Sequence, residues 1–297
     1  LSSSAALAKG VITAPDQPHI AYVHSPARYA WDLTHDYMDT LGGPLGSIKR
    51  RLAHRMMHRF RMWDMRTPQS VDLMIANSSF IARRIQKIYR RRACVVYPPV
   101  NTERFVPGTS EREDFYLTAS RLVPYKKIDL IVRAFAKRPD RRLVVIGDGP
   151  EMAKIKQVAG RNVEIFGYQS FEVLLDHMQR ARAFVFAARE DFGIVPVEAQ
   201  ACGTPVISLA DGGTAETVRP LGRSDRPTGA WFYEQTEDAI LTALSEFESD
   251  ADAIKAEDCR ANALFFGAER FQRQMKYILA HGSEVGFDAL LDAKLPE

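Results

Sequence analysis

The sequence predicts an α/β protein, with a mostly parallel sheet covered by helices on both faces in its second part. From residue 115 onward, short apolar runs alternate with segments of helical periodicity, which is the pattern of repeated strand–helix units. At 297 residues the chain exceeds the usual size of one domain, so two domains are expected. Its 46% hydrophobic and 26% charged residues are typical of a globular protein.

The first part of the chain contains fewer clear elements. Residues 19–24 (HIAYVH) predict a short buried strand, and residues 25–41 an aromatic-rich loop and helix. Three glycines and a proline at 41–46 predict a break. Residues 71–79 predict a strand that ends in an Asn-Ser-Ser helix start, and residues 94–100 a strand closed by two prolines.

The second part alternates regularly between strands and helices. Strands are predicted over 115–120, 142–147, 163–167, 183–188 and 205–209, and helices over 128–137, 151–159, 170–181, 236–248 and 251–282. Pro98, Pro99, Pro107 and Gly108 mark a hinge between domains. We therefore predict domains at 1–107 and 108–280 and a C-terminal tail at 281–297. Packing of this tail on the first domain is one interpretation.

Charge is unevenly distributed along the chain. Residues 1–114 carry 17 Lys and Arg against 10 Asp and Glu, whereas the remainder carries 23 against 27. A basic first part predicts an anionic partner, such as a membrane surface, a phosphorylated lipid or nucleic acid. Cys94, Cys202 and Cys259 have neither metal-site spacing nor a disulfide pattern, which fits a reducing cytosol. The first residues lack a signal-peptide pattern, so a cytoplasmic location is expected.

Residues 47–66 predict a basic amphipathic helix. An apolar stripe recurs at helical spacing, and it consists of Ile48, Leu52, Met56, Phe60 and Trp63. Lysines and arginines crowd the rest of the helix surface. Two interpretations remain open: the helix lies on an anionic membrane, or its apolar stripe faces the protein core and its basic face is solvated.

Two glutamates bracket the most informative segment of the chain. Glu190 and Glu198 lie between the strand predicted at 183–188 and the strand at 205–209, where an open α/β sheet builds its ligand site. Carboxylates placed there can grip hydroxyl-rich ligands, although Glu198 can instead favour a helix N-terminus by its charge. The backbone amides of Gly193, Ile194 and Val195 would point at a ligand, because a helix N-terminus binds anions.

Arg121 and Lys126 follow the strand predicted at 115–120. An arginine fork and a lysine point charge at the carboxyl edge of a strand suit a diphosphate. The alternative is two surface cations beside a helix start. Lys127 is a less favoured substitute for Lys126.

Other loops are weaker candidates. The glycine-rich turn at 147–151 (GDGPE) does not complete a dinucleotide motif, and a structural turn is favoured. The loop at 166–170 (FGYQS) either receives a nucleobase edge on its backbone or serves as an ordinary helix cap. His24 ends a predicted strand, where either a structural or a catalytic role is open.

No metal site is predicted from the sequence. Asp250 and Asp252 form an Asp-x-Asp pair between two predicted helical segments, and we interpret it as a solvated helix start. No His, Cys or Asp cluster has zinc or calcium spacing, and the chain contains no P-loop.

Several of these motifs occur together in the order found in glycosyltransferase family 4. The matching segments are SRLVPYKK, VVIGDGPE, VEIFGYQS, the two glutamates with seven residues between them, ACGTPVIS and GGTAETV. The chain resembles this family over almost its whole length. The resemblance implies the GT-B fold, with two Rossmann-like domains. HSPARYAWD also resembles a segment of bacterial polysaccharide glycosyltransferases, often mannosyltransferases.

The resemblance implies a role for each matching residue. Arg121 and Lys126 would neutralise the departing diphosphate, Glu190 would hold sugar hydroxyls, and Glu198 would hold the nucleotide ribose. His24 would lie near the reacting sugar carbon. The remaining donor-binding positions are the backbone of Phe192, Gly193, Ile194 and Val195 against sugar and diphosphate, and the 165–169 segment with Gly167 and Tyr168 beside the base.

The implied reaction is a retaining, metal-independent hexosyl transfer. The donor would be a nucleotide-diphospho-sugar, with GDP-mannose suggested by the HSPARYAWD segment alone, and no further cofactor is expected. The acceptor would be a polysaccharide or lipid-linked glycan, and the partners would not include nucleic acid. Peripheral contact of residues 47–66 with the inner face of the membrane is a further interpretation.

The first domain departs from the family pattern. The family begins with a strand, a glycine-rich loop and further strand–helix units, and at roughly 30 residues per unit some 75–90 residues are expected to be missing before Leu1. This makes an inactive nucleotide-binding fragment an alternative to an active enzyme. A nucleotide-sugar epimerase of the same architecture is a less favoured alternative.

Overall fold

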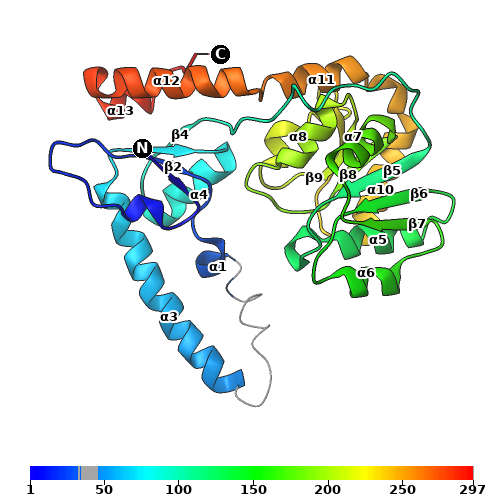
Figure 1. Ribbon diagram of the computed structural model, residues 1–297, viewed down its shortest axis with the longest axis horizontal. Coiled ribbons are helices and arrows are strands. Elements are labelled where there is room, and N and C mark those ends of the chain that lie inside the picture. Colours follow the sequence, from blue (N-terminus) through cyan, green and yellow to red (C-terminus); the bar gives the residue numbers. More distant parts are fainter. Residues whose placement is uncertain (33, 35–45, 297) are drawn as a thin grey trace. The chain divides into compact units, whose positions relative to one another are not determined.

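Two parallel sheets organise the residues that the computed structural model describes, which are 1–32, 34 and 46–296. The chain divides into two units, each with its own sheet (Figure 1). Unit 1 contains residues 1–97 and 272–297, and unit 2 contains residues 98–271. The predicted fold class, α/β with two Rossmann-like sets of parallel strands, is confirmed. Most of the helix predicted within 25–41 and of the break predicted at 41–46 lies outside the described residues, which omit 33 and 35–45.

Unit 1 has a four-stranded parallel sheet in the order β1-β2-β3-β4. The strands span Ser2–Ser4, Ile20–Val23, Leu73–Ala76 and Cys94–Val95. The helices of this unit are α1 (Arg28–Trp31), α3 (Gly46–Arg66), α4 (Ser79–Tyr89) and α13 (Phe287–Leu290), with the 3-10 turns η1 (Ala8–Gly10) and η2 (Thr67–Ser70). The predicted strands at 19–24 and 71–79 are confirmed, and the strand predicted at 94–100 is shorter. β1 was not predicted.

The helix predicted at 47–66 is present as α3, but its packed face includes only the C-terminal part of the predicted apolar stripe. Ile48, Leu52 and Met56 are 65%, 60% and 58% exposed. The expectation that this stripe faces the core is therefore wrong for these three residues. The face that packs is rotated around the helix and carries Met57 and Phe60, which contact a small cluster of buried alanines. Because a helix has 3.6 residues per turn, Met57 lies opposite Ile48.

A buried ion pair fixes the C-terminal part of α3. Lys9 Nζ lies 2.5 Å from Asp64 Oδ1, and the side chains are 4% and 0% exposed. Asp64 Oδ2 accepts hydrogen bonds from Trp31 Nε1 at 2.8 Å and from the Tyr89 hydroxyl at 2.9 Å. Lys9 also donates to the carbonyl oxygen of Ala6. One carboxylate thus joins η1, α1, α3 and α4.

Unit 2 has a six-stranded parallel sheet in the order β10-β9-β8-β5-β6-β7. In chain order, strands β5 to β10 span Phe115–Ala119, Arg142–Ile146, Val163–Gly167, Ala183–Phe186, Val206–Leu209 and Gly229–Phe232. The helices are α5 (Ile128–Ala136), α6 (Met152–Val158), α7 (Phe171–Arg180), α8 (Ile194–Ala201), α9 (Thr214–Thr217), α10 (Glu237–Ser249) and α11 (Ala256–Leu264), with the turns η3 (Pro124–Lys126) and η4 (Ala251–Ala253). The helix α12 (Ala268–Val285) begins in unit 2 and continues into unit 1.

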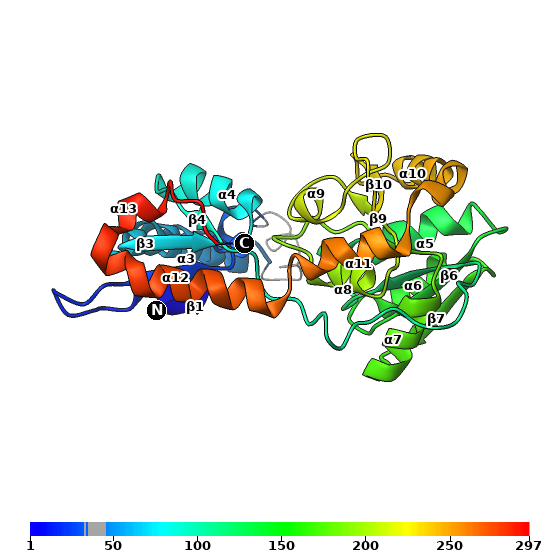
Figure 2. The same cartoon turned by 90° about the horizontal axis from the view of Figure 1, so that it is seen from above.

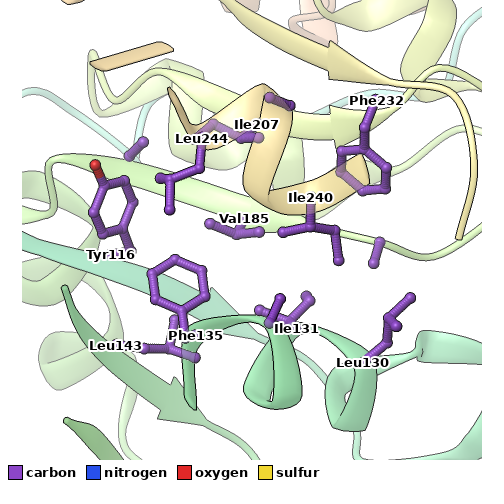
Figure 3. Packing of buried hydrophobic residues seen from close by; sticks show 14 of the residues in the cluster. Tyr116, Leu130, Ile131, Phe135, Leu143, Val185, Ile207, Phe232, Ile240 and Leu244 are labelled. Carbon is purple, nitrogen blue, oxygen red and sulfur yellow. The ribbon is translucent and has the colours of Figure 1, made fainter. Parts of the chain in front are cut away.

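The central strands of unit 2 are buried on both faces, which explains their nearly continuous apolar sequence. On one face, α5 and α10 pack against each other and against the sheet (Figure 2). Figure 3 shows this cluster, in which strand residues such as Tyr116 and Val185 meet Phe135 and Leu244 from the two helices. The opposite face is covered by helices that include α7 and α8.

Three parts of unit 2 differ from the prediction. β10 was not predicted, because GAWF is a short run without alternation. The helix predicted over 251–282 is interrupted between Leu264 and Ala268, where Gly267 instead pairs with Val100 in an isolated bridge. The single-turn helix α9 within the GGTAETV segment was not predicted.

Candidate functional site

The order of strands in unit 2 creates one point where the chain changes direction across the sheet. β5 and β8 are neighbours. The chain continues from β5 to β6 and β7 on one side, and from β8 to β9 and β10 on the other. The loops that follow β5 and β8 therefore separate at this point, and in open α/β sheets such a switch point is where ligands bind.

Lys126 and Glu190 meet at this switch point. Lys126 Nζ lies 2.6 Å from Glu190 Oε1, and the side chains are 16% and 20% exposed. The ammonium group also lies over the rings of Tyr125 and Phe186, at 5.6 and 5.7 Å from their centroids. The structure thus joins two predicted site residues from different loops, in a position that solvent can still reach.

The loop that carries Lys126 rests on the GDGPE turn. Leu122 N donates to the carbonyl oxygen of Asp148 at 2.9 Å, and Ser120 N donates to Ile146 at 3.0 Å. A Cβ atom at Gly147 would lie 1.8 Å from the carbonyl oxygen of Ser120, and one at Gly149 would clash with Leu122. The two glycines are thus required for backbone packing, which agrees with the structural interpretation of this turn.

Arg121 lies on the same loop but does not join the pair. Its side chain is exposed, and it has no ion pair among the residues that the structure describes. Lys127, the less favoured substitute, adopts a left-handed conformation with φ 56° and precedes α5.

The loop after β8 is held by two glycines that the sequence reasoning did not single out. Gly213 N donates to the carbonyl oxygen of Glu190 at 2.8 Å. A Cβ atom at Gly212 would lie 2.3 Å from that oxygen, and one at Gly213 would lie 2.2 Å from Phe192 Cα. These glycines allow the GGT segment to approach and position the glutamate loop. The two adjacent glycines of the GGTAETV segment were the sequence feature that could have indicated this close backbone contact.

Glu198 lies in the second turn of α8, and its side chain lacks a hydrogen-bond or ion-pair partner among the described residues. The helix begins after Gly193, which has φ 85°, and no acidic residue lies in its first turn. The alternative that Glu198 stabilises the helix N-terminus is therefore not supported by its position. Burial raises the pKa of the Glu198 carboxyl to about 7. A desolvated carboxylate without a partner is suited to accept hydrogen bonds from ligand hydroxyls.

The other predicted donor-binding residues lie at the carboxyl ends of β8 and β7 in unit 2. Phe192 is buried, Ile194 is exposed and Val195 is half-buried at the start of α8. Gly167 has φ 71° with no atom within 4 Å of the position that a Cβ would take, and Tyr168 is exposed. Ser170 caps α7 by accepting from Val173 N, so the helix-cap interpretation of this loop holds whether or not a base binds there.

His24 lies in unit 1, at the carboxyl end of β2. Its Nε2 atom is 2.9 Å from Ser3 Oγ, and its ring contacts Tyr22 edge-on, with 5.3 Å between centroids. Although the side chain is exposed on one side, desolvation by its neighbours lowers the pKa of the imidazole. We therefore expect a neutral histidine at pH 7. β1, which carries Ser3, was not predicted, so this contact was not predicted either.

Within the described parts of the chain, no group of three or more His, Cys, Asp or Glu side chains is arranged to hold a metal ion. Asp250 and Asp252 are both exposed where α10 ends and η4 begins. All three cysteines are free and buried. None of the described helices is long and apolar enough to cross a membrane.

Two units that each contain a parallel, Rossmann-like sheet are the arrangement of the GT-B class of α/β proteins. Residues 99–264, more than half of the chain, match the family described as glycosyl transferases group 1. The chain belongs to this family.

Curated relatives match about half of the chain. A GDP-mannose-dependent monoacylated alpha-(1-6)-phosphatidylinositol monomannoside mannosyltransferase of Corynebacterium glutamicum is 31% identical over 180 residues, which cover 50% of this chain and 47% of the relative. A D-inositol 3-phosphate glycosyltransferase of Mycobacterium marinum is 33% identical over 172 residues, covering 50% and 37%. The chain therefore matches less than half the length of these relatives.

Solved structures share the fold at lower identity. Anabaena HepE in complex with UDP and glucose aligns with a TM-score of 0.65 and 18% identity, over 89% of this chain and 72% of that one. A sucrose-phosphate synthase from Thermosynechococcus elongatus aligns with a TM-score of 0.68 and 20% identity, over 90% and 68%. At this identity the likeness concerns the fold alone.

Proposed function

We propose that this chain belongs to a retaining glycosyltransferase that moves a hexose from a nucleotide-diphospho-sugar to a polysaccharide or lipid-linked glycan. The observation that carries the proposal is the Lys126–Glu190 pair at the switch point of unit 2. Membership of the glycosyl transferases group 1 family supports transfer chemistry. Mannose is our choice of sugar and GDP-mannose our choice of donor, supported by the HSPARYAWD segment and by the relative from Corynebacterium glutamicum.

In this proposal, Lys126 and Arg121 stabilise the departing diphosphate. The bond between the sugar carbon and the diphosphate oxygen breaks, the electron pair leaves with the diphosphate, and the acceptor hydroxyl bonds to the same carbon. The leaving phosphate takes the proton of that hydroxyl. Cations that are already positioned where negative charge develops lower the barrier most effectively. No metal is invoked, because the two cations meet the charge.

The Lys126–Glu190 pair has a further role in this scheme. Without a ligand, Glu190 holds the ammonium group of Lys126 between the two aromatic rings. A bound diphosphate would replace Glu190 as the partner of Lys126, which would leave the Glu190 carboxylate available to sugar hydroxyls. Glu198 would accept hydrogen bonds from the ribose.

Binding of GDP by the full chain, measured by isothermal titration calorimetry, tests the site. We expect the double variant Lys126→Ala, Glu190→Ala to bind GDP on the order of 10- to 100-fold more weakly, because a charge-assisted contact is lost. Lys127→Asn is the matched control, since asparagine tolerates the left-handed conformation and the variant removes a neighbouring charge. Unchanged GDP affinity in the double variant, or an equal loss in the control, would contradict the assignment.

A second candidate function is nucleotide binding without transfer. Turnover of GDP-mannose in the presence of a glycan acceptor distinguishes the two candidates. GDP binding without turnover favours the second, whereas turnover excludes it. Proton NMR of the donor in the absence of acceptor would detect the epimerase alternative as a changed sugar.

A further inference from the structure

The exposed stripe of α3 has a composition that the transferase proposal does not explain. Ile48, Leu52 and Met56 follow one another at four-residue intervals and form one line along the helix. Each is more than half exposed. Large apolar side chains that recur on one exposed face of a helix mark an interaction surface more often than isolated ones do.

Exposed cations flank this stripe on both sides. Lys49 lies on one side, and Arg51, Arg55 and Arg59 lie along the other. All four are exposed. The sequence from Gly46 to Trp63 contains no Asp or Glu, so no acidic side chain on this part of the helix compensates the charge. The surface is therefore apolar along its centre and positively charged at its margins.

The opposite face of α3 is held firmly by the rest of unit 1. Met57 and Phe60 pack against buried alanines, and Arg61 donates to the carbonyl oxygen of Ala30 at 2.5 Å. The buried Asp64 anchors the last turn to Lys9. In Figure 1, α3 runs outward from the strands of its unit, and its C-terminal end lies nearest to them. The exposed stripe is thus on a helix whose orientation within unit 1 is fixed.

We propose that this stripe binds an anionic membrane surface. The apolar side chains would enter the boundary between headgroups and acyl chains, and the flanking cations would contact anionic headgroups, as in amphipathic helices that lie in the interface. The combination of apolar and cationic side chains favours lipid over nucleic acid. A phosphate backbone attracts the cations but offers no apolar environment for the line of three apolar side chains. Binding to vesicles requires no donor, so this proposal is independent of the transferase proposal.

Co-sedimentation of the full chain with vesicles tests the surface. We expect sedimentation with vesicles of equimolar phosphatidylcholine and phosphatidylglycerol, little with pure phosphatidylcholine, and release at about 1 M salt, where electrostatic attraction is screened within about 3 Å. The variant Arg51→Gln, Arg55→Gln, Arg59→Gln should lower the partition coefficient on the order of 100-fold. The variant Leu52→Gln, Met56→Gln should lower it on the order of 10-fold or more.

Matched controls separate this surface from general charge and hydrophobicity. Lys156→Gln, Arg161→Gln, Lys255→Gln removes the same charge from exposed positions of unit 2, and Leu264→Gln, Leu279→Gln removes two exposed leucines elsewhere. Both should sediment like the unmodified chain, and circular dichroism should show intact folding in all variants. Equal loss in the controls, no sedimentation, or retention of a single-stranded oligonucleotide in place of vesicles would overturn the proposal.

Discussion

The two units each contain a short lysine–carboxylate pair, and the surroundings of the two pairs differ. Lys9 and Asp64 in unit 1 are almost completely buried, and Asp64 also accepts from Trp31 and Tyr89. Lys126 and Glu190 in unit 2 have a similar separation, but both side chains remain partly exposed. The first carboxylate is saturated by protein donors, whereas the second has capacity for a ligand.

The distance between the charged atoms of an ion pair therefore does not reveal its role. A buried pair with every partner satisfied is costly to break, because removal of one partner leaves a charge without solvent or counter-ion. A partly exposed pair contributes less to stability, since water can replace the lost partner. We therefore expect the Lys9–Asp64 pair to matter for folding and the Lys126–Glu190 pair to matter for binding.

The largest expected effect is that of Asp64→Asn on stability. The variant leaves the Lys9 ammonium buried without a counter-ion, so the free energy of unfolding should fall by about 3–5 kcal/mol. The measurement is chemical denaturation of the full chain, monitored by circular dichroism. The double variant Lys9→Met, Asp64→Asn removes both charges and should recover part of the loss. A stable Asp64→Asn variant would show that this pair is not structural.

Glu198 extends the comparison to a carboxylate without a cation. Its pKa in the folded chain is raised from the usual 4.5 to about 7 by burial. The unfolded state therefore loses this proton at lower pH than the folded state, and the group disfavours folding progressively as pH rises from about 4.5 to 7. Below that window the penalty is absent, and above it the penalty is complete.

We therefore expect Glu198→Gln to stabilise the chain at alkaline pH. The gain relative to the unmodified chain should grow by about 2 kcal/mol between pH 5 and pH 8. Denaturation curves of both proteins at the two pH values provide the measurement. Glu246→Gln, at an exposed glutamate of α10, is the control and should show no such growth. A constant difference for Glu198→Gln would show that its carboxyl is not desolvated.

Local patterns were sufficient to predict most of the fold. The buried strands and amphipathic helices of unit 2 are visible because each carries its own periodicity. β1 was not predicted, because the serines of Ser2–Ser4 carry no apolar pattern and their pairing with β2 depends on tertiary context. The apolar stripe of α3 was predicted correctly as a pattern, but its facing depended on Ala6, Ala27 and Ala30, which are distant in sequence.

The candidate site was predictable in its residues but not in its contacts. The motifs indicated Lys126 and Glu190 separately, yet their contact requires β5 and β8 to be neighbours, and strand order is not written in any local segment. Asp64 gave no signal, because its three partners come from three separate parts of the chain. The roles of Gly212 and Gly213 likewise depend on a backbone contact with the loop after β8.

The smallest expected effect on stability belongs to Lys126→Met, and it completes the comparison between the two pairs. Methionine leaves an apolar side chain beside Tyr125 and Phe186 but removes the charge and its contacts with both rings, and Glu190 remains partly solvated. The free energy of unfolding should therefore change by less than about 1 kcal/mol. In the presence of excess GDP, the unmodified chain should gain stability by ligand binding, whereas the variant should gain much less. A loss of several kcal/mol without GDP would make this pair structural, and the distinction between the two units would then fail.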